Sequence, residues 1–176
     1  MRYIQSTLLI PVVEASESVN KWRVEYQDSA KRGMPAHITL FFPFLHPSEI
    51  GDSTITQLTH FFKKVNKFTY QLNKIENFPL VVYLAPTNGS KFTKISQNLA
   101  TKYPQIKPYE GEYLAPIPHC TLARMSTEAK TEEIKGQIET SIKHEPPISC
   151  DAHEAWLMYK NELNYWGIHE KFRFKD

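Results

Sequence analysis

Residues 37–40, His-Ile-Thr-Leu, return nearly unchanged at residues 119–122 as His-Cys-Thr-Leu, in a chain of 176 residues. Side chains alternate along a strand, so the histidine and threonine of each tetrad point one way and the two apolar residues point the other way. A tetrad of this kind is expected by chance in roughly one chain of this size in fifty. Two copies therefore indicate a repeated unit that carries a function.

The elements around the first tetrad follow a simple order. The patterns of apolar residues and turn residues predict alternating strands and helices. The expected elements are a strand over 3–10, a helix from Ser16 or Ser18 to near Gly33, a strand over 36–42, a helix from Asp52 or Ser53, and a strand over 68–76.

The same order begins again near residue 80. The second set comprises a strand over 80–85, a helix after the turn at 88–90, a strand over 117–123, a helix capped by Thr127, and strands near 148–158 and 164–174. Such a duplication predicts one domain with two similar lobes, approximately 1–79 and 80–176, packed around a shared cleft. The loop over 104–118 is long and rich in Pro and Tyr, which is typical of a cleft wall or lid.

Composition narrows the class of protein. Hydrophobic residues make up 41% and charged residues 23%, an ordinary globular balance. No apolar run reaches the length of a membrane helix, and no cleavable leader is visible, so we expect a cytoplasmic protein with no membrane partner. The two cysteines, Cys120 and Cys150, are too few for a disulfide framework and are expected to be buried in the core.

The net charge of +2 indicates the kind of ligand. Proteins that bind duplex DNA usually carry a dense basic surface, which this sequence lacks. A nucleotide or a short RNA end is therefore a better match than a long duplex.

The two tetrads suggest acid–base chemistry at phosphorus. Neutral His37 or His119 can take a proton from water or a hydroxyl, while the other, protonated, donates a proton to the leaving oxygen. Thr39 and Thr121 can donate hydrogen bonds to the phosphate oxygens and hold phosphorus in line. This arrangement needs no metal and no cofactor, and the sequence leaves open which histidine is the base.

These motifs resemble those of the two-histidine (2H) phosphoesterase superfamily, also called the LigT-like or 2'-5' RNA ligase family. The resemblance covers most of the chain and rests on the tetrads at 37–40 and 119–122, on Phe-Pro-Phe at 42–44, and on Arg124. It implies an α+β bilobal fold in which two antiparallel sheets line a central cleft and helices pack outside. It also implies a phosphodiesterase that acts on 2',3'-cyclic phosphate or 2'-5' linked nucleotides.

Other residues have weaker claims to the site. Arg124 is expected on the strand face opposite Thr121 unless a bulge redirects it, so phosphate contact and surface ion pairing both remain open. Phe41 continues the His–Thr face and is expected either to stack on a base or to pack in the core. Tyr109 and Tyr113, in the long loop, are further candidates for base stacking.

Two alternatives to this enzyme remain. The chain could be a non-catalytic module that binds RNA ends or nucleotides, or a phosphoesterase for a non-nucleotide cyclic phosphate. A monomer is expected, since the repeat already builds a two-sided cleft within one chain.

Overall fold

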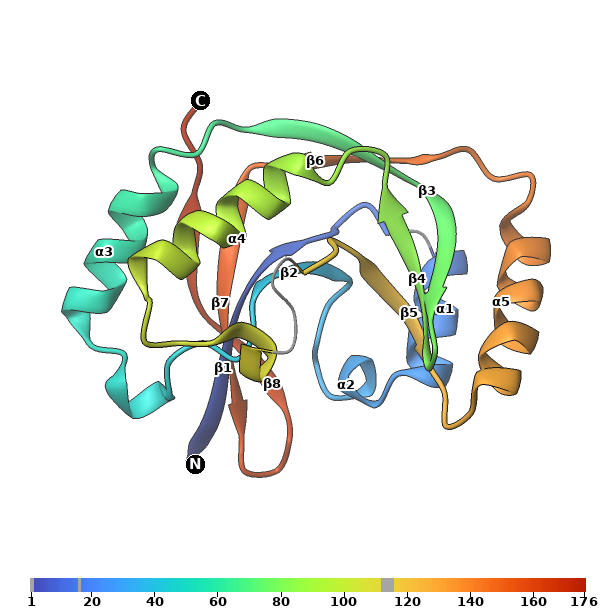
Figure 1. Cartoon of the computed structure of the whole chain (residues 1–176), viewed down its shortest axis with the longest axis horizontal. Coiled ribbons are helices and arrows are strands. Elements are labelled where there is room, and N and C mark those ends of the chain that lie inside the picture. Colours follow the sequence, from blue (N-terminus) through green and yellow to red (C-terminus); the bar gives the residue numbers. More distant parts are fainter. Residues whose placement is uncertain (1, 16, 112–115) are drawn as a thin grey trace.

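The computed structural model describes residues 2–15, 17–111 and 116–176. It is an α+β fold with two four-stranded antiparallel sheets, as expected (Figure 1). The strands are β1 (Tyr3–Pro11), β2 (His37–Phe41), β3 (Phe68–Phe78), β4 (Val81–Pro86), β5 (Cys120–Arg124), β6 (Ile148–Ala152), β7 (Glu154–Asn161) and β8 (Trp166–Arg173). The helices are α1 (Glu17–Tyr26), α2 (Asp28–Lys31), α3 (Asp52–Phe62), α4 (Ser90–Lys102) and α5 (Glu128–Ile142), with 3₁₀ turns η1 (Pro47–Glu49) and η2 (Pro108–Gly111).

The helix expected to run to Gly33 is two helices. Gln27 adopts an extended conformation (φ −135°, ψ 103°), which ends α1 and starts α2. Gly33 then turns the chain with φ +89°, and a Cβ there would lie 2.6 Å from the carbonyl oxygen of Trp166. Glycine is therefore required at the point where the segment leading to β2 crosses β8.

Each sheet contains strands from both halves of the chain. The first sheet has the order β2-β1-β7-β8, and the second has the order β5-β4-β3-β6. The lobe boundary expected near residue 79 therefore does not separate the two sheets, since β3 belongs to the second sheet and β7 and β8 to the first. The strand expected over 148–158 is likewise two strands, β6 and β7, which lie in different sheets and are separated by His153.

Within the second sheet β3 pairs with β6, with Tyr70 opposite Cys150, and the chain passes from β6 directly into β7 of the first sheet. Beyond this pairing β3 continues alongside β4, and the chain after β6 continues as β7 alongside β1. The strands of the two halves are thus related by an approximate two-fold axis. The single strand β3 of the first half corresponds to the two consecutive strands β6 and β7 of the second half. This relation places the two tetrads at equivalent positions, because β2 and β5 are each the edge strand next to the first strand of their half.

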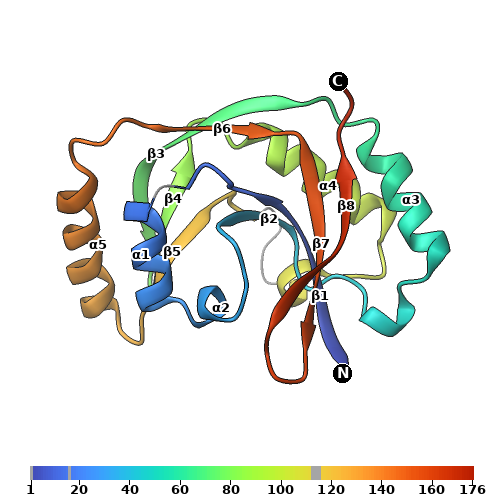
Figure 2. The same ribbon diagram turned by 180° about the vertical axis from the view of Figure 1, so that it is seen from behind.

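Helices cover the outer faces of the sheets. In two opposite views α3 and α4 lie over the first sheet, and α1 and α5 lie over the second (Figures 1 and 2). The first helix of each half therefore packs on the strand that carries the tetrad of the other half: α1 packs on β5, and α4 packs on β2. Among the described residues, no helix is both long and apolar enough to cross a bilayer.

Candidate active site

The two tetrads lie close together, on strands from different sheets. His37 and Thr39 are on β2, Thr121 is on β5, and His119 immediately precedes β5. Cα atoms of β2 and β5 approach within 8 Å of each other. All four side chains are partly exposed, whereas the intervening Ile38 and Cys120 are fully buried. The alternation expected from sequence thus places both His–Thr pairs on one side of the strands.

Both imidazole rings are held in the same way. Nδ1 of His37 lies 2.8 Å from the carbonyl oxygen of Pro35, and Nδ1 of His119 lies 2.7 Å from that of Ile117. Each acceptor is two residues before its histidine. A carbonyl oxygen can only accept, so each Nδ1 carries the hydrogen and donates it. In the neutral ring, Nε2 then keeps a free lone pair that can accept a proton.

Burial keeps both histidines neutral. The pKa of His37 is lowered to about 4, mainly by desolvation. The hydrogen bond to the Pro35 carbonyl opposes this shift, and the charges of Arg23 and His119 add to it. Desolvation also lowers the pKa of His119, with a smaller contribution from Arg124. At pH 7 both rings in the free protein are therefore unprotonated, and both Nε2 atoms are proton acceptors.

A buried arginine stands behind His37. Arg23 on α1 is only 4% exposed and donates to the carbonyl oxygens of Met34 at 2.9 Å and Pro35 at 2.8 Å. The sequence-based reasoning did not single it out. Helical spacing would have indicated it, because Arg23 lies on the apolar face of α1 formed by Val19, Trp22 and Tyr26.

The fourth residue of each tetrad is a β-bulge. Leu9 pairs with Thr39 and Leu8 with Phe41, so Leu40 is an extra residue on β2. In the same way Tyr83 pairs with Thr121 and Val82 with Ala123, so Leu122 is an extra residue on β5. A bulge shifts the alternation by one residue, and the residue that follows is redirected.

The bulge on β5 decides where Arg124 lies. Leu122 and Ala123 are both fully buried, and Arg124 returns to the face that carries Thr121. Its side chain is exposed, and no carboxylate of the described residues lies within 4.0 Å of it. Because its charge lowers the pKa of His119, Arg124 is near enough to act on the site. Surface ion pairing, one of its two expected roles, is thus not observed with any residue that the structure describes.

The bulge on β2 removes Phe41 from the site. Phe41 is fully buried and packs edge-to-face on Phe44 with ring centroids 5.9 Å apart. The expectation that Phe41 stacks on a base is therefore wrong, and its alternative, core packing, is correct. Phe42, one residue later, is half-buried and occupies the position equivalent to Arg124.

The two loop tyrosines are not defined by the structure. Tyr109 lies in the turn η2, and its side chain is outside the described part of the structure. Tyr113 lies outside the described residues. Their expected role in base stacking remains a prediction.

Aromatic rings surround the second histidine. Phe78 and Tyr83 each have a ring centroid 5.2 Å from that of His119, and Phe78 meets the imidazole edge-to-face. Tyr83 pairs with Thr121 across the sheet and donates its hydroxyl to Glu76 Oε2 at 3.0 Å. Neither ring could be assigned from sequence, because they belong to β3 and β4, and the order of β3, β4 and β5 in the sheet depends on pairing across the chain.

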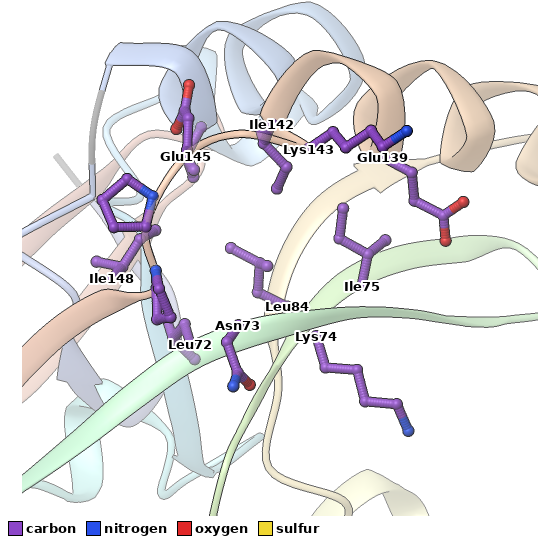
Figure 3. A pocket seen from close by; sticks show the side chains of 13 residues that line it. Leu72, Asn73, Lys74, Ile75, Leu84, Glu139, Ile142, Lys143, Glu145 and Ile148 are labelled. Atoms are coloured by element: carbon purple, nitrogen blue, oxygen red, sulfur yellow. The ribbon is translucent and has the colours of Figure 1, made fainter.

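A cavity of about 360 Å³ lies on the opposite face of the second sheet (Figure 3). Ile75, Leu84 and Ile142 point into it, and Lys74 points away. It is formed by β3, β4, the end of α5 and the segment leading to β6. It contains neither His–Thr pair and is separate from the candidate site. In the described part of the chain, no three His, Cys, Asp or Glu side chains are placed to hold a metal ion.

The fold is that of known phosphoesterases. The structure matches Escherichia coli LigT complexed with NADP+ with a TM-score of 0.64 and 16% identity, and the match covers all of both chains. A crystal structure of a phosphoesterase matches with a TM-score of 0.62 and 14% identity over 99% of this chain and all of that one.

Sequence comparison identifies the family. The profile of the 2'-5' RNA ligase superfamily matches residues 11–164, and the chain belongs to this superfamily. Proteins of Bacillus cytotoxicus and Bacillus cereus, provisionally named phosphoesterases, are each 26% identical to it. The alignments cover 94% of this chain and 93% and 94% of those relatives.

Proposed function

We propose that this chain is a metal-independent phosphodiesterase that acts on 2',3'-cyclic phosphates or 2'-5' linked nucleotides. One observation carries the proposal. Each of the two imidazoles is tied through Nδ1 to the carbonyl two residues earlier and is followed by a threonine two residues later. One lies on the edge strand β2 and the other immediately before the edge strand β5, and these two strands approach each other. General acid–base catalysis at phosphorus needs two such groups on opposite sides of one phosphate.

The proposed reaction uses both imidazoles. One neutral histidine takes a proton from water through Nε2 as the water oxygen bonds to phosphorus. The other histidine, protonated, gives its proton to the ribose oxygen as the bond from that oxygen to phosphorus breaks. Thr39 and Thr121 donate hydrogen bonds to the non-bridging oxygens, which carry charge in the transition state. The first imidazole ends protonated and the second neutral, and exchange with solvent restores both.

The nucleotide part of the proposal draws support from a structural relative. LigT has been crystallised with NADP+, with 3'-AMP and with ATP, and shares the fold of this chain. The proposal places a nucleotide or a short RNA end in the site of this protein, which we expect to act as a cytoplasmic monomer.

The test is an activity assay in the presence of EDTA. Purified protein is incubated with the four 2',3'-cyclic nucleotides, a 2'-5' linked dinucleotide and a non-nucleotide cyclic phosphate, and the products are separated by chromatography. Turnover of the nucleotide substrates that survives EDTA supports the proposal. Binding of the nucleotides without turnover would instead indicate a non-catalytic nucleotide-binding module. Turnover of the non-nucleotide cyclic phosphate alone would indicate a phosphoesterase with a non-nucleotide substrate.

A further inference from the structure

Arg23 is a buried cation that no carboxylate of the described residues contacts. Its guanidinium has three hydrogen-bond acceptors, all uncharged: Asn20 Oδ1 at 3.2 Å, and the carbonyl oxygens of Met34 and Pro35. No carboxylate of residues 2–15, 17–111 or 116–176 lies within 4.0 Å of it, and its Nε is buried without a partner. Burial of an uncompensated charge is costly, so stability alone does not explain this residue.

The arginine acts directly on the environment of His37. The Pro35 carbonyl accepts both from Arg23 Nη2 at 2.8 Å and from His37 Nδ1 at 2.8 Å. Arg23 therefore holds the Pro35 carbonyl oxygen in place, and this oxygen in turn orients the imidazole of His37. Second-sphere hydrogen bonds orient the ligands of metal sites in the same way. Of the described ionisable groups, His119 also acts on the His37 ring, and the buried thiol of Cys120 on β5 contacts the backbone of His37.

The other half of the site lacks this cation. The buried face of α4, formed by Phe92, Ile95, Ser96 and Leu99, repeats the spacing of Val19, Trp22, Arg23 and Tyr26 on α1. Ser96 thus occupies the position of Arg23. Among the described side chains, the Ile117 carbonyl accepts only from His119. The cation that acts on His119 is Arg124, which is exposed to solvent.

We propose that Arg23 is a positioning residue that makes the two histidines unequal, holding His37 as the neutral proton acceptor and leaving His119 to carry the proton. The assignment rests on the proposed function. A bound phosphate attracts one proton into the site. The fixed charge of Arg23 disfavours that proton on His37, so it resides on His119, which then donates to the leaving oxygen.

The first test measures the two histidines in the free protein. The ring ¹³C and ¹H shifts of His37 and His119 are followed by NMR from pH 3 to 9 in the wild type, in Arg23→Gln and in the matched control Ser96→Ala. We expect His37 to titrate below His119 in the wild type. Arg23→Gln should raise the pKa of His37 by about one unit, a tenfold change in proton affinity, and Ser96→Ala should move neither histidine.

Loss of the charge must be separated from loss of packing. Arg23→Lys keeps the charge and should leave His37 titrating at low pH. A pKa of His37 that is unchanged in Arg23→Gln, or equal shifts of both histidines, would overturn the proposal. If Arg23→Gln does not fold, the wild type still provides a test. Salt at 1 M screens exposed charges within about 3 Å, so it should raise the pKa of His119 and leave that of His37 nearly unchanged.

The pH profile of kcat/KM distinguishes the two assignments. If His37 is the base, a higher pKa in Arg23→Gln moves the acidic limb to higher pH and does not increase the maximum. If His37 were instead the acid, the same change would increase the protonated fraction and raise the maximum by up to about tenfold. A higher maximum would reject the assignment. The NMR shifts need no turnover, so failure of the proposed function would be visible separately from failure of the role of Arg23.

Discussion

The two halves of the site have the same backbone but different surroundings. Each presents a histidine tied to a carbonyl, a threonine two residues later, and a bulge at the following leucine. Behind His37 the structure places a buried guanidinium. Beside His119 it places two aromatic rings and an exposed arginine. The two tetrad strands thus have the same backbone geometry. The helices and neighbouring strands place different charges and rings around the two histidines.

This difference teaches how a two-fold arrangement can perform a one-directional reaction. Hydrolysis needs one acceptor and one donor, but two identical imidazoles would share a proton equally. A buried charge is little screened by solvent and an exposed charge is strongly screened, so the two arginines cannot have equal effects.

Loss of either histidine should have the largest effect. His37→Ala and His119→Ala should each reduce kcat about 10³-fold or more, and the double variant should lose little further, because the two groups act in one step. Rates with a 2',3'-cyclic nucleotide under saturating conditions measure this. His60→Ala is the control, since His60 is exposed on α3 and should leave the rate unchanged. Independent, multiplicative losses would show that the histidines do not work together.

The threonines should come next. Thr39→Val and Thr121→Val each remove a hydrogen bond to a charged oxygen while they keep the shape, so each should reduce kcat/KM about 10- to 100-fold. Thr→Ser at either position should retain most of the activity. Steady-state kinetics of the four variants, with folding checked by circular dichroism, provides the measurement. Normal rates in both valine variants would remove the threonines from the mechanism.

Much of this architecture could be predicted from sequence. The tetrads, the face on which each His–Thr pair lies and the order of strands and helices all depend on local periodicity, which a single sequence contains. The sheet to which each strand belongs depends on pairing across the chain. The run 148–158 was therefore expected as one strand, although its two parts lie in different sheets.

The residues around the tetrads show the same limit. Phe41 and Arg124 were assigned to faces by strict alternation, and one extra residue in each strand reverses both assignments. A bulge leaves no mark in an apolar run such as Leu40-Phe41. The burial of Arg23, by contrast, could have been inferred from its helical position, and only its contact with the carbonyl next to His37 required the structure.

Acid should destabilise the protein through His37. Its pKa is lowered to about 4 in the folded chain and is near 6.5 when unfolded. The stabilisation is thus present above pH 6.5 and is lost as the pH falls from 6.5 towards 4, because in this range the unfolded state binds the proton more tightly than the folded state. Because His37 is partly exposed, we expect a loss of about 1–2 kcal/mol from this group. Urea unfolding from pH 7 to 4.5 should show a smaller loss in His37→Gln, and an equal loss in both would contradict the low pKa.

The smallest effect should come from Arg124. Arg124→Gln removes an exposed charge that lowers the pKa of His119, so that pKa should rise, and KM for an anionic substrate should increase about two- to fivefold. Both effects should disappear when wild type and variant are compared in 1 M salt, since the charge is already screened there. Titration of His119 and kinetics at low and high salt test this. The effect of Arg124 on the pKa of His119 could instead persist in high salt while the effect of Arg23 on the pKa of His37 disappears. That result would contradict the distinction between a screened, exposed arginine and an unscreened, buried one.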